Sequence, residues 1–176
     1  MYSSSLEPFP SHGLVHISLY RNVKNAKELR KRLLSRDLEL SYAFIDAKVI
    51  LDKFQVLVAS NIAIYNETHH KLRTHNVHSE IVYSLSPSTN IRESLKNHGL
   101  SDDTTDVVIV KVGESAETIQ THLTKIIKGE ERDVEEMTGC VDLARVKKYY
   151  KIADSISDRE ELLKAVVGSI AIKNLS

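Results

Sequence analysis

The chain has 176 residues, enough for one domain that buries roughly two-thirds of the surface exposed by its unfolded form. Its content of 41% hydrophobic and 27% charged residues is ordinary for a soluble globular protein, and its formal net charge is zero. No apolar run approaches the roughly 20 residues of a membrane span, and the first residues lack a secretory signal pattern. A single cysteine excludes an internal disulfide. We therefore expect one soluble domain, residues 1–176, in a reducing compartment.

The first 35 residues predict a strand followed by a basic helix. Residues 1–11 are rich in serine and proline and are expected to form a loose N-terminal lead-in. Apolar and polar side chains then alternate, which predicts a strand over 14–20. A helix is expected over 22–35, and its outer faces carry cations: Lys24, Lys27, Lys31, Arg32 and Arg36. These cations form either an ordinary solvated face or a surface directed at phosphates.

A buried central helix is predicted over 54–65. Residues 46–50 act as a link, and Asp52 is a suitable N-cap with Gln55 at the capping-box position. The stretch that follows is apolar on nearly all sides and has no glycine or proline. We expect the sheet to pack on this helix.

The segment 70–99 combines a His-rich basic approach, an apolar run and a second capped helix. The run 81–85 predicts a buried strand, and the residues at 86–89 predict a turn. Asn90 is expected to cap the next helix, with Glu93 completing a capping box, and Gly99 to end it in the left-handed conformation.

Beyond residue 100 the pattern again alternates strand and helix. We expect a polar turn at 101–106, a central strand at 107–110 and an amphipathic helix at 116–127. The acidic stretch 130–136 is expected to be a solvated connector. A short helix over 141–150 and an extended segment at 150–152 complete this part.

The last helix, over 157–175, is apolar on two sides. Ser157 and Glu160 are placed as a capping box, and a broad apolar face runs from Leu162 to Ala171. A surface helix normally has a polar opposite side, but here that side carries Ala165, Gly168, Ile172 and Leu175. The helix is therefore either buried wholly within its own domain or covered by another protein.

The chain contains no recognisable catalytic, metal-binding or cofactor-binding motif. Gly-rich phosphate loops, nucleophile elbows and zinc-binding helices are all missing, and Cys140 has no nucleophile context. Histidines 69, 70, 75 and 78 lie near Glu80, but they do not complete a metal site. We therefore predict no metal, no cofactor and no enzymatic activity, and we expect the histidines to cap a helix or line a polar surface.

The polar residues of segment 70–99 also suit contact with single-stranded RNA. Cations near a helix N-terminus hold phosphates, and amide or hydroxyl groups bind unpaired bases. The candidate residues are Lys71, Arg73, Ser79, Ser86, Asn90, Ile91 and Arg92. The alternative is a set of solvated surface residues with a capping asparagine.

Several short sequence motifs along the chain resemble those of one known family. They are Val23-Lys24-Asn25-Ala26 with Leu29-Arg30, Phe54-Gln55-Val56-Leu57-Val58-Ala59, Arg73-Thr74, Ser79-Glu80-Ile81, Leu85-Ser86-Pro87, Asn90-Ile91, Gly99 with Ser101-Asp102, and Val146-Lys147-Lys148-Tyr149-Tyr150-Lys151. Their order and spacing, from about residue 12 to the C-terminus, resemble the TPRKB (PRPK-binding protein) family, the small kinase-binding subunit of the KEOPS complex.

This resemblance implies an α/β (α+β) fold, a small and mainly antiparallel sheet wrapped by helices. It implies a non-catalytic subunit that binds the complex's atypical kinase/ATPase and supports its activity. It also implies a role in recruiting tRNA by its 3′ tail for threonylcarbamoyl-adenosine (t6A) modification, in the cytoplasm and nucleus, with indirect contact to other KEOPS subunits. The C-terminal helix matches the kinase-contacting end, which assigns kinase binding to Leu163, Ala165, Val167, Gly168, Ala171, Ile172 and Leu175.

Two other classes of function remain open at this point. One is a stand-alone module that binds single-stranded RNA without the kinase. The other is an enzyme with an unrecognised site around His75, His78 and Glu80.

Overall fold

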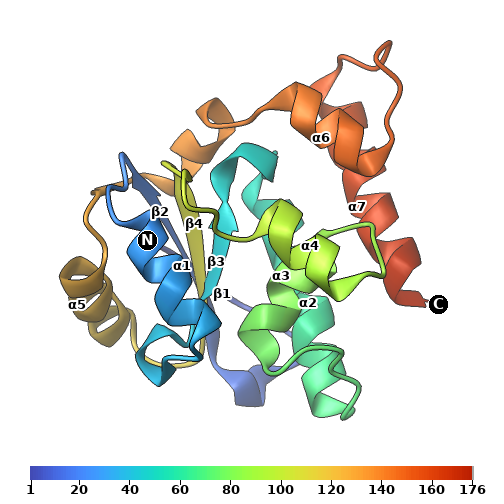
Figure 1. Cartoon of the computed structure of the whole chain (residues 1–176). Helices are drawn as coiled ribbons and strands as arrows, with labels where there is room; N and C mark the ends of the chain where they lie inside the picture. The colour runs from blue at the N-terminus through green and yellow to red at the C-terminus, as the bar shows by residue number, and fades with distance from the viewer. Residues whose placement is uncertain (176) are drawn as a thin grey trace.

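An antiparallel sheet runs through the middle of the molecule, with helices on both of its faces (Figure 1). The computed structural model describes residues 1–175, with side chains up to residue 174. Within these residues the strands are β1 (Tyr2–Ser5), β2 (Leu14–Arg21), β3 (Ala43–Asp46), β4 (Val107–Val112) and β5 (Glu130–Arg132). Their order is β1-β2-β4-β3, and β5 pairs with β2. Since β4 occupies one edge of β2, β1 and β5 share its other edge end to end.

The helices divide between the two faces of the sheet. They are α1 (Ala26–Leu34), α2 (Lys53–Thr68), α3 (Val77–Leu85), α4 (Ile91–His98), α5 (Ala116–Ile126), α6 (Leu143–Tyr150) and α7 (Arg159–Leu175). Short 3-10 turns lie at Pro10–His12, Leu38–Leu40, Ala47–Val49 and Val134–Gly139. Helices α1 and α5 cover one face, and α2, α3, α6 and α7 pack against the other. The predicted α+β fold, a mainly antiparallel sheet wrapped by helices, is confirmed.

The side chains of β2 show how one strand supplies both cores. Val15, Ile17 and Leu19 point to the α2 side, and Tyr20 belongs to the core under α1 and α5. Successive side chains of a strand alternate between the faces of a sheet, so helices on both sides bury β2 from Val15 to Tyr20. The predicted strand over 14–20 and the central strand at 107–110 are both confirmed.

Helix α2 is the central helix of the larger core, as predicted, although it is exposed at both ends. Its buried Gln55 does not complete a capping box. The amide oxygen accepts a hydrogen bond from the Leu51 backbone (3.0 Å), and the amide nitrogen donates to the Tyr150 hydroxyl (3.2 Å). That hydroxyl donates in turn to the Leu85 carbonyl. Because a buried amide needs partners, this network joins α2, α3 and α6.

The predicted strand over 81–85 is wrong, because these residues lie in helix α3. Asn76 accepts a hydrogen bond from the Ser79 backbone (2.9 Å), and the Ser79 hydroxyl closes a capping box. Nearly every residue of the helix is buried. A continuous apolar run does not distinguish a buried strand from a buried helix, so the start signal at Asn76 was the informative feature.

The N-terminal lead-in and the acidic connector are more ordered than expected. Within 1–11, the segment Tyr2–Ser5 forms edge strand β1, because backbone pairing does not require apolar side chains. Within 130–136, Glu130–Arg132 forms β5, and Val134 is buried in the core. The strand at Ala43–Asp46 was missed because it is short and apolar without alternation.

Three helix ends also differ from expectation. Helix α7 begins at Arg159, with Asp158 accepting a hydrogen bond from the Glu161 backbone (2.9 Å), so Ser157 is not its cap. Lys151 is left-handed (φ 54°) and ends α6, so 150–152 is not extended. Gly99 is not left-handed (φ −84°). A Cβ there would lie 2.5 Å from the Leu95 carbonyl oxygen, so close approach requires glycine. None of the helices in the described part is long and apolar enough to cross a membrane.

Candidate functional site

Helix α7 packs on the domain with one side only. Leu162, Val166 and Ile170 recur every four residues and are almost fully buried against α2, α3 and α6. This i, i+4 spacing places them on one face, which is the face that completes the larger core. The interpretation that α7 lies wholly inside its own domain therefore does not hold.

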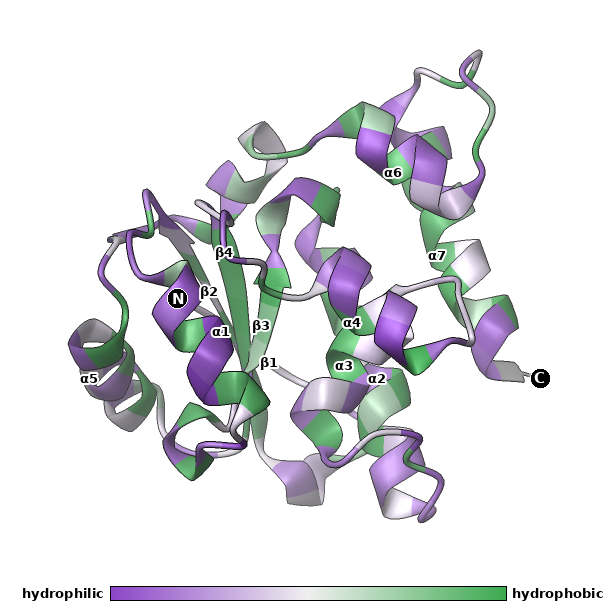
Figure 2. Ribbon diagram, viewed as in Figure 1, coloured by the Kyte–Doolittle hydropathy of each residue, from purple (hydrophilic) through white to green (hydrophobic). Residues whose placement is uncertain are grey.

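Apolar residues recur along α7 (Figure 2), and those on its outer side are partly or largely exposed. The Ile172 side chain is 71% exposed, and a Cβ built on Gly168 would meet no atom within 4 Å. Four other predicted kinase-binding residues are partly exposed: Leu163, Ala165, Val167 and Ala171. The side chain of Leu175 lies outside the described residues. We call the surface formed by Leu163, Ala165, Val167, Gly168, Ala171 and Ile172 the α7 outer face; Leu163, at its border, also packs against the larger core.

Lys173 connects the end of α7 to the C-terminal end of α3, within the segment of the predicted RNA contacts. Its ammonium lies 3.4 Å from the centroid of the Tyr83 ring and donates hydrogen bonds to the carbonyls of Tyr83 and Ser86, the latter at 2.9 Å. Burial is the main reason that the pKa of Lys173 falls to about 8. In the sequence, Lys173 directly follows a largely apolar stretch of the last helix, and this signal for a buried cation was not used in the prediction.

The basic loop 69–76 is held in place by a buried carboxylate. Glu80 on α3 accepts hydrogen bonds from the backbone N–H groups of Arg73 (3.0 Å) and Thr74 (2.9 Å). It also accepts from the Thr74 hydroxyl (2.8 Å) and the Asn66 amide (3.1 Å). Four donors satisfy the carboxylate, so it is a structural anchor that presents the side chains of the loop to solvent.

The predicted RNA-contacting residues divide into exposed and structural ones. Lys71, Arg73, Asn90, Ile91 and Arg92 are exposed. Ser79 instead completes the cap of α3, and buried Ser86 accepts a hydrogen bond from the Ser88 backbone (3.1 Å). These two serines hold the local backbone through their hydroxyl groups.

The exposed candidates form two groups at opposite ends of α3. Lys71 and Arg73 precede this helix, and Ile91 and Arg92 follow it on the first turn of α4. Helix α3 between them has nine residues and is about 13 Å long. The charge of Arg73 acts on Tyr83 and Lys173, which lie between the two groups.

An exposed aromatic pair lies beside the basic loop. The Tyr65 and His69 rings stack with their centroids 4.0 Å apart, and the Lys71 ammonium lies 5.9 Å from the Tyr65 ring centroid. Tyr65 is 44% exposed. Aromatic faces with an adjacent cation are suited to stacking against unpaired bases. This feature was hidden in the sequence because Tyr65 reads as the end of a buried helix.

The histidines of this region do not converge on a metal site. His75 accepts a hydrogen bond from Arg36 (3.0 Å) at the surface, and His78 is buried and accepts from the Val112 backbone (3.2 Å). Among the residues described, no three His, Cys, Asp or Glu side chains are arranged to hold a metal ion. His78 and Glu80 do not share a face, because α3 is a helix.

Two buried histidines, His78 and His98, make the stability of the fold sensitive to acid. Desolvation lowers the pKa of both His78 and His98 to about 3, with the charges of Lys111 and Lys173 as the respective secondary causes. The folded state therefore binds fewer protons than the unfolded state between pH 6.5 and 3, so stability falls as the pH falls through this range. We expect each histidine to contribute up to about 1.4 kcal/mol per pH unit.

Urea unfolding at pH 7 and pH 5 tests this expectation. A His78→Gln variant should be less stable at pH 7 but should lose less stability on going to pH 5. An equal loss in wild type and variant would contradict the assignment.

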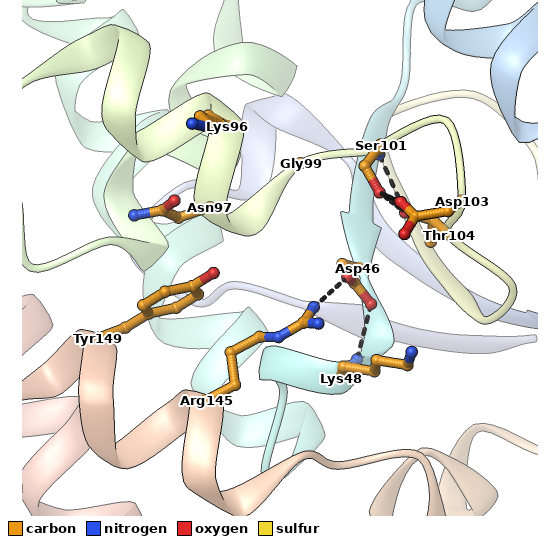
Figure 3. Close-up of a pocket in the computed structure, with 10 residues that line it drawn as sticks. All are labelled: Asp46, Lys48, Lys96, Asn97, Gly99, Ser101, Asp103, Thr104, Arg145 and Tyr149. Carbon is orange, nitrogen blue, oxygen red and sulfur yellow. Dashed lines mark hydrogen bonds and ion pairs between the residues drawn. The ribbon is translucent and has the colours of Figure 1, made fainter.

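A polar cleft of about 180 Å³ lies between α4, α6 and the loop after Gly99 (Figure 3). Arg145 enters it and forms an ion pair with Asp46 (2.9 Å), which also accepts a hydrogen bond from the Lys48 backbone (3.0 Å). Burial raises the pKa of the Asp46 carboxyl. Because the central charges are already paired, we assign this cleft a structural role in joining α6 to the end of β3.

The fold and these surfaces define a single-domain α+β protein with an exposed apolar face on its last helix and an exposed basic loop beside α3. The chain belongs to the family described as "Kinase binding protein CGI-121", whose model matches residues 20–174. It is 36% identical to "EKC/KEOPS complex subunit cgi121" of Aspergillus fumigatus, over 96% of this chain and 94% of the relative. It is also 36% identical to "EKC/KEOPS complex subunit TPRKB" of Danio rerio, over 99% and 98%, and to "EKC/KEOPS complex subunit CGI121" of Gibberella zeae, over 97% of each. The family resemblance inferred from short sequence motifs is thereby confirmed.

Proposed function

We propose that this chain is a non-catalytic subunit of a KEOPS complex and binds the atypical kinase/ATPase of that complex through the α7 outer face. The observation that carries the proposal is the apolar, uncovered outer side of a helix whose inner side completes the core. Ile172 is largely exposed, and the open space at Gly168 allows another chain to approach the backbone closely. The family description and the names of the relatives supply the class of partner.

The second part of the proposal is that the exposed residues around α3 hold the single-stranded 3′ tail of tRNA for t6A modification by another subunit. Lys71, Arg73 and Arg92 supply cations, and the Tyr65–His69 pair supplies a face for base stacking. We call this set, with Asn90 and Ile91, the tail surface. The complex acts in the cytoplasm and nucleus.

A comparison of two RNAs tests the tail surface. Fluorescence anisotropy of the full chain at low salt should show tighter binding to intact tRNA than to the same tRNA lacking its 3′ tail. Ile91→Glu should remove this preference, because it places a negative charge where the tail binds, whereas Thr121→Glu on the far side of the sheet should preserve it. Equal affinity of wild type for both RNAs would refute this part of the proposal.

A stand-alone RNA-binding module predicts tail-dependent binding with no affinity for the kinase. Calorimetric titration of the full chain with the KEOPS kinase of the same organism separates the two functions. A complete lack of binding heat at several temperatures would favour the module.

A further inference from the structure

A basic groove lies on the opposite side of the sheet from α7, along helix α1. It has a volume of about 640 Å³ and is lined by Lys24, Asn25, Lys27, Glu28, Arg30, Lys31, Leu34, Asp102 and Lys128. Five cations therefore face two carboxylates in a molecule whose net charge is zero. The groove is therefore positively charged although the whole chain is neutral.

Three of the five cations have no acidic partner. Arg30 pairs with Asp102 (3.0 Å), and Lys128 lies 3.8 Å from Glu28. Lys24, Lys27 and Lys31 form no ion pair with any described residue. Lys27 and Lys31 lie four residues apart on one face of α1, about 6 Å along its axis, and Lys24 precedes the helix by two residues. We call these three lysines the lysine row.

The groove is a built feature with rigid walls. Buried Asn25 donates a hydrogen bond to the Ile126 carbonyl (2.9 Å) and accepts one from the Lys128 backbone (3.0 Å). The Lys24 backbone donates to the Lys128 carbonyl (2.8 Å). A Cβ on Gly129 would lie 3.0 Å from the Arg21 carbonyl oxygen, so this loop closely approaches the connection between β2 and α1. The three bonds hold Lys128 across from the lysine row.

We propose that the α1 groove binds the phosphodiester backbone of RNA as a second contact for the tRNA held by the tail surface. Lysines without an acidic partner neutralise phosphates without reading sequence. A protein partner fits less well, since Leu34 is the one apolar residue in the lining and lysine is depleted from protein interfaces.

Charge also continues from the groove toward the tail surface. Arg36, which follows α1, donates a hydrogen bond to His75 in the loop that carries Lys71 and Arg73 (3.0 Å). The lysine row, this contact and the basic loop form one path along which an RNA strand leaves the tail surface. The inference rests on the proposed tRNA function for the identity of the RNA, and on the groove alone for the binding of phosphate.

The test compares Lys27→Gln/Lys31→Gln with a matched control, Lys148→Gln/Lys151→Gln. All four lysines are exposed, and each double variant removes two charges. Affinity for intact and tail-less tRNA is measured by anisotropy over a series of salt concentrations. For the groove variant we expect roughly tenfold weaker binding to both RNAs at low salt, with the slope of log K against log salt reduced by about 1.4 to 1.8. The tail preference should persist, and the control should change affinity less than about twofold.

Each outcome decides a separate question. A groove variant that binds like the control would overturn the inference, and so would one that loses only the tail preference. If wild type shows no tail preference but the groove variant still weakens binding, the tail proposal fails and the groove stands. If an acidic protein partner is the true occupant, the variants leave RNA affinity unchanged. Absence of any RNA binding by wild type at the lowest salt overturns both.

Discussion

The variant Gly168→Arg is expected to lose kinase binding by at least about 100-fold while it folds normally. A Cβ at Gly168 meets no atom within 4 Å, so the isolated domain has room for the new side chain. Arginine favours helix over glycine by up to about 1 kcal/mol, so the variant should melt at the same or a higher temperature. A charged side chain at the centre of an apolar interface is left without its hydration, which weakens binding strongly.

Calorimetry against the KEOPS kinase measures the binding, and a thermal melt measures the fold. Ile172→Glu should behave in the same way, because it replaces the most exposed apolar side chain of the α7 outer face. Thr121→Arg, on an exposed position of α5, adds the same charge elsewhere and should bind like wild type. Unchanged affinity in both α7 variants would place the kinase on a different surface. A truncated chain ending at Lys164 is not a useful test of kinase binding, because the truncation removes Val166 and Ile170 from the core and destabilises the fold.

The variant Glu80→Ala is expected to destabilise the protein by about 3–5 kcal/mol. It leaves four hydrogen-bond donors without their acceptor, three of them in the basic loop. Unsatisfied buried donors carry a desolvation penalty of about 1–3 kcal/mol each, which local rearrangement reduces in part. The melting temperature should fall by roughly 6–20 °C for a domain of this size.

Hydrogen exchange should locate the damage from Glu80→Ala. The amides of Arg73 and Thr74 should lose protection first, because their acceptor is gone. Glu80→Gln keeps one acceptor oxygen and should have a smaller effect, and Glu117→Ala on the exposed side of α5 should have almost none. A melting temperature within about 2 °C of wild type for Glu80→Ala would mean that the anchor contributes little.

Much of the fold follows from local signals in the chain. Alternation over 14–20, the apolar run at 107–110 and the caps Asp52 and Asn90 predict elements that the structure contains. The two-sided apolar pattern of the last helix left two possibilities open, burial within the domain or cover by another protein, and the structure leaves its outer side partly exposed. These signals are reliable because helix and strand periods, and the groups that cap a helix, act over a few neighbouring residues.

Other features depend on contacts between residues that are distant along the chain. Residues 81–85 are buried by contacts with α2 and the sheet, and an apolar run alone does not specify whether such a segment is a helix or a strand. Ser86 was a candidate RNA contact, but the fold buries it, and its carbonyl accepts a hydrogen bond from Lys173, 87 residues further along the chain. The α1 groove exists because Asn25 holds residues 126–128 across from the lysine row. Composition and local pattern thus specify the elements and the family, whereas packing decides which polar side chains remain available to a partner.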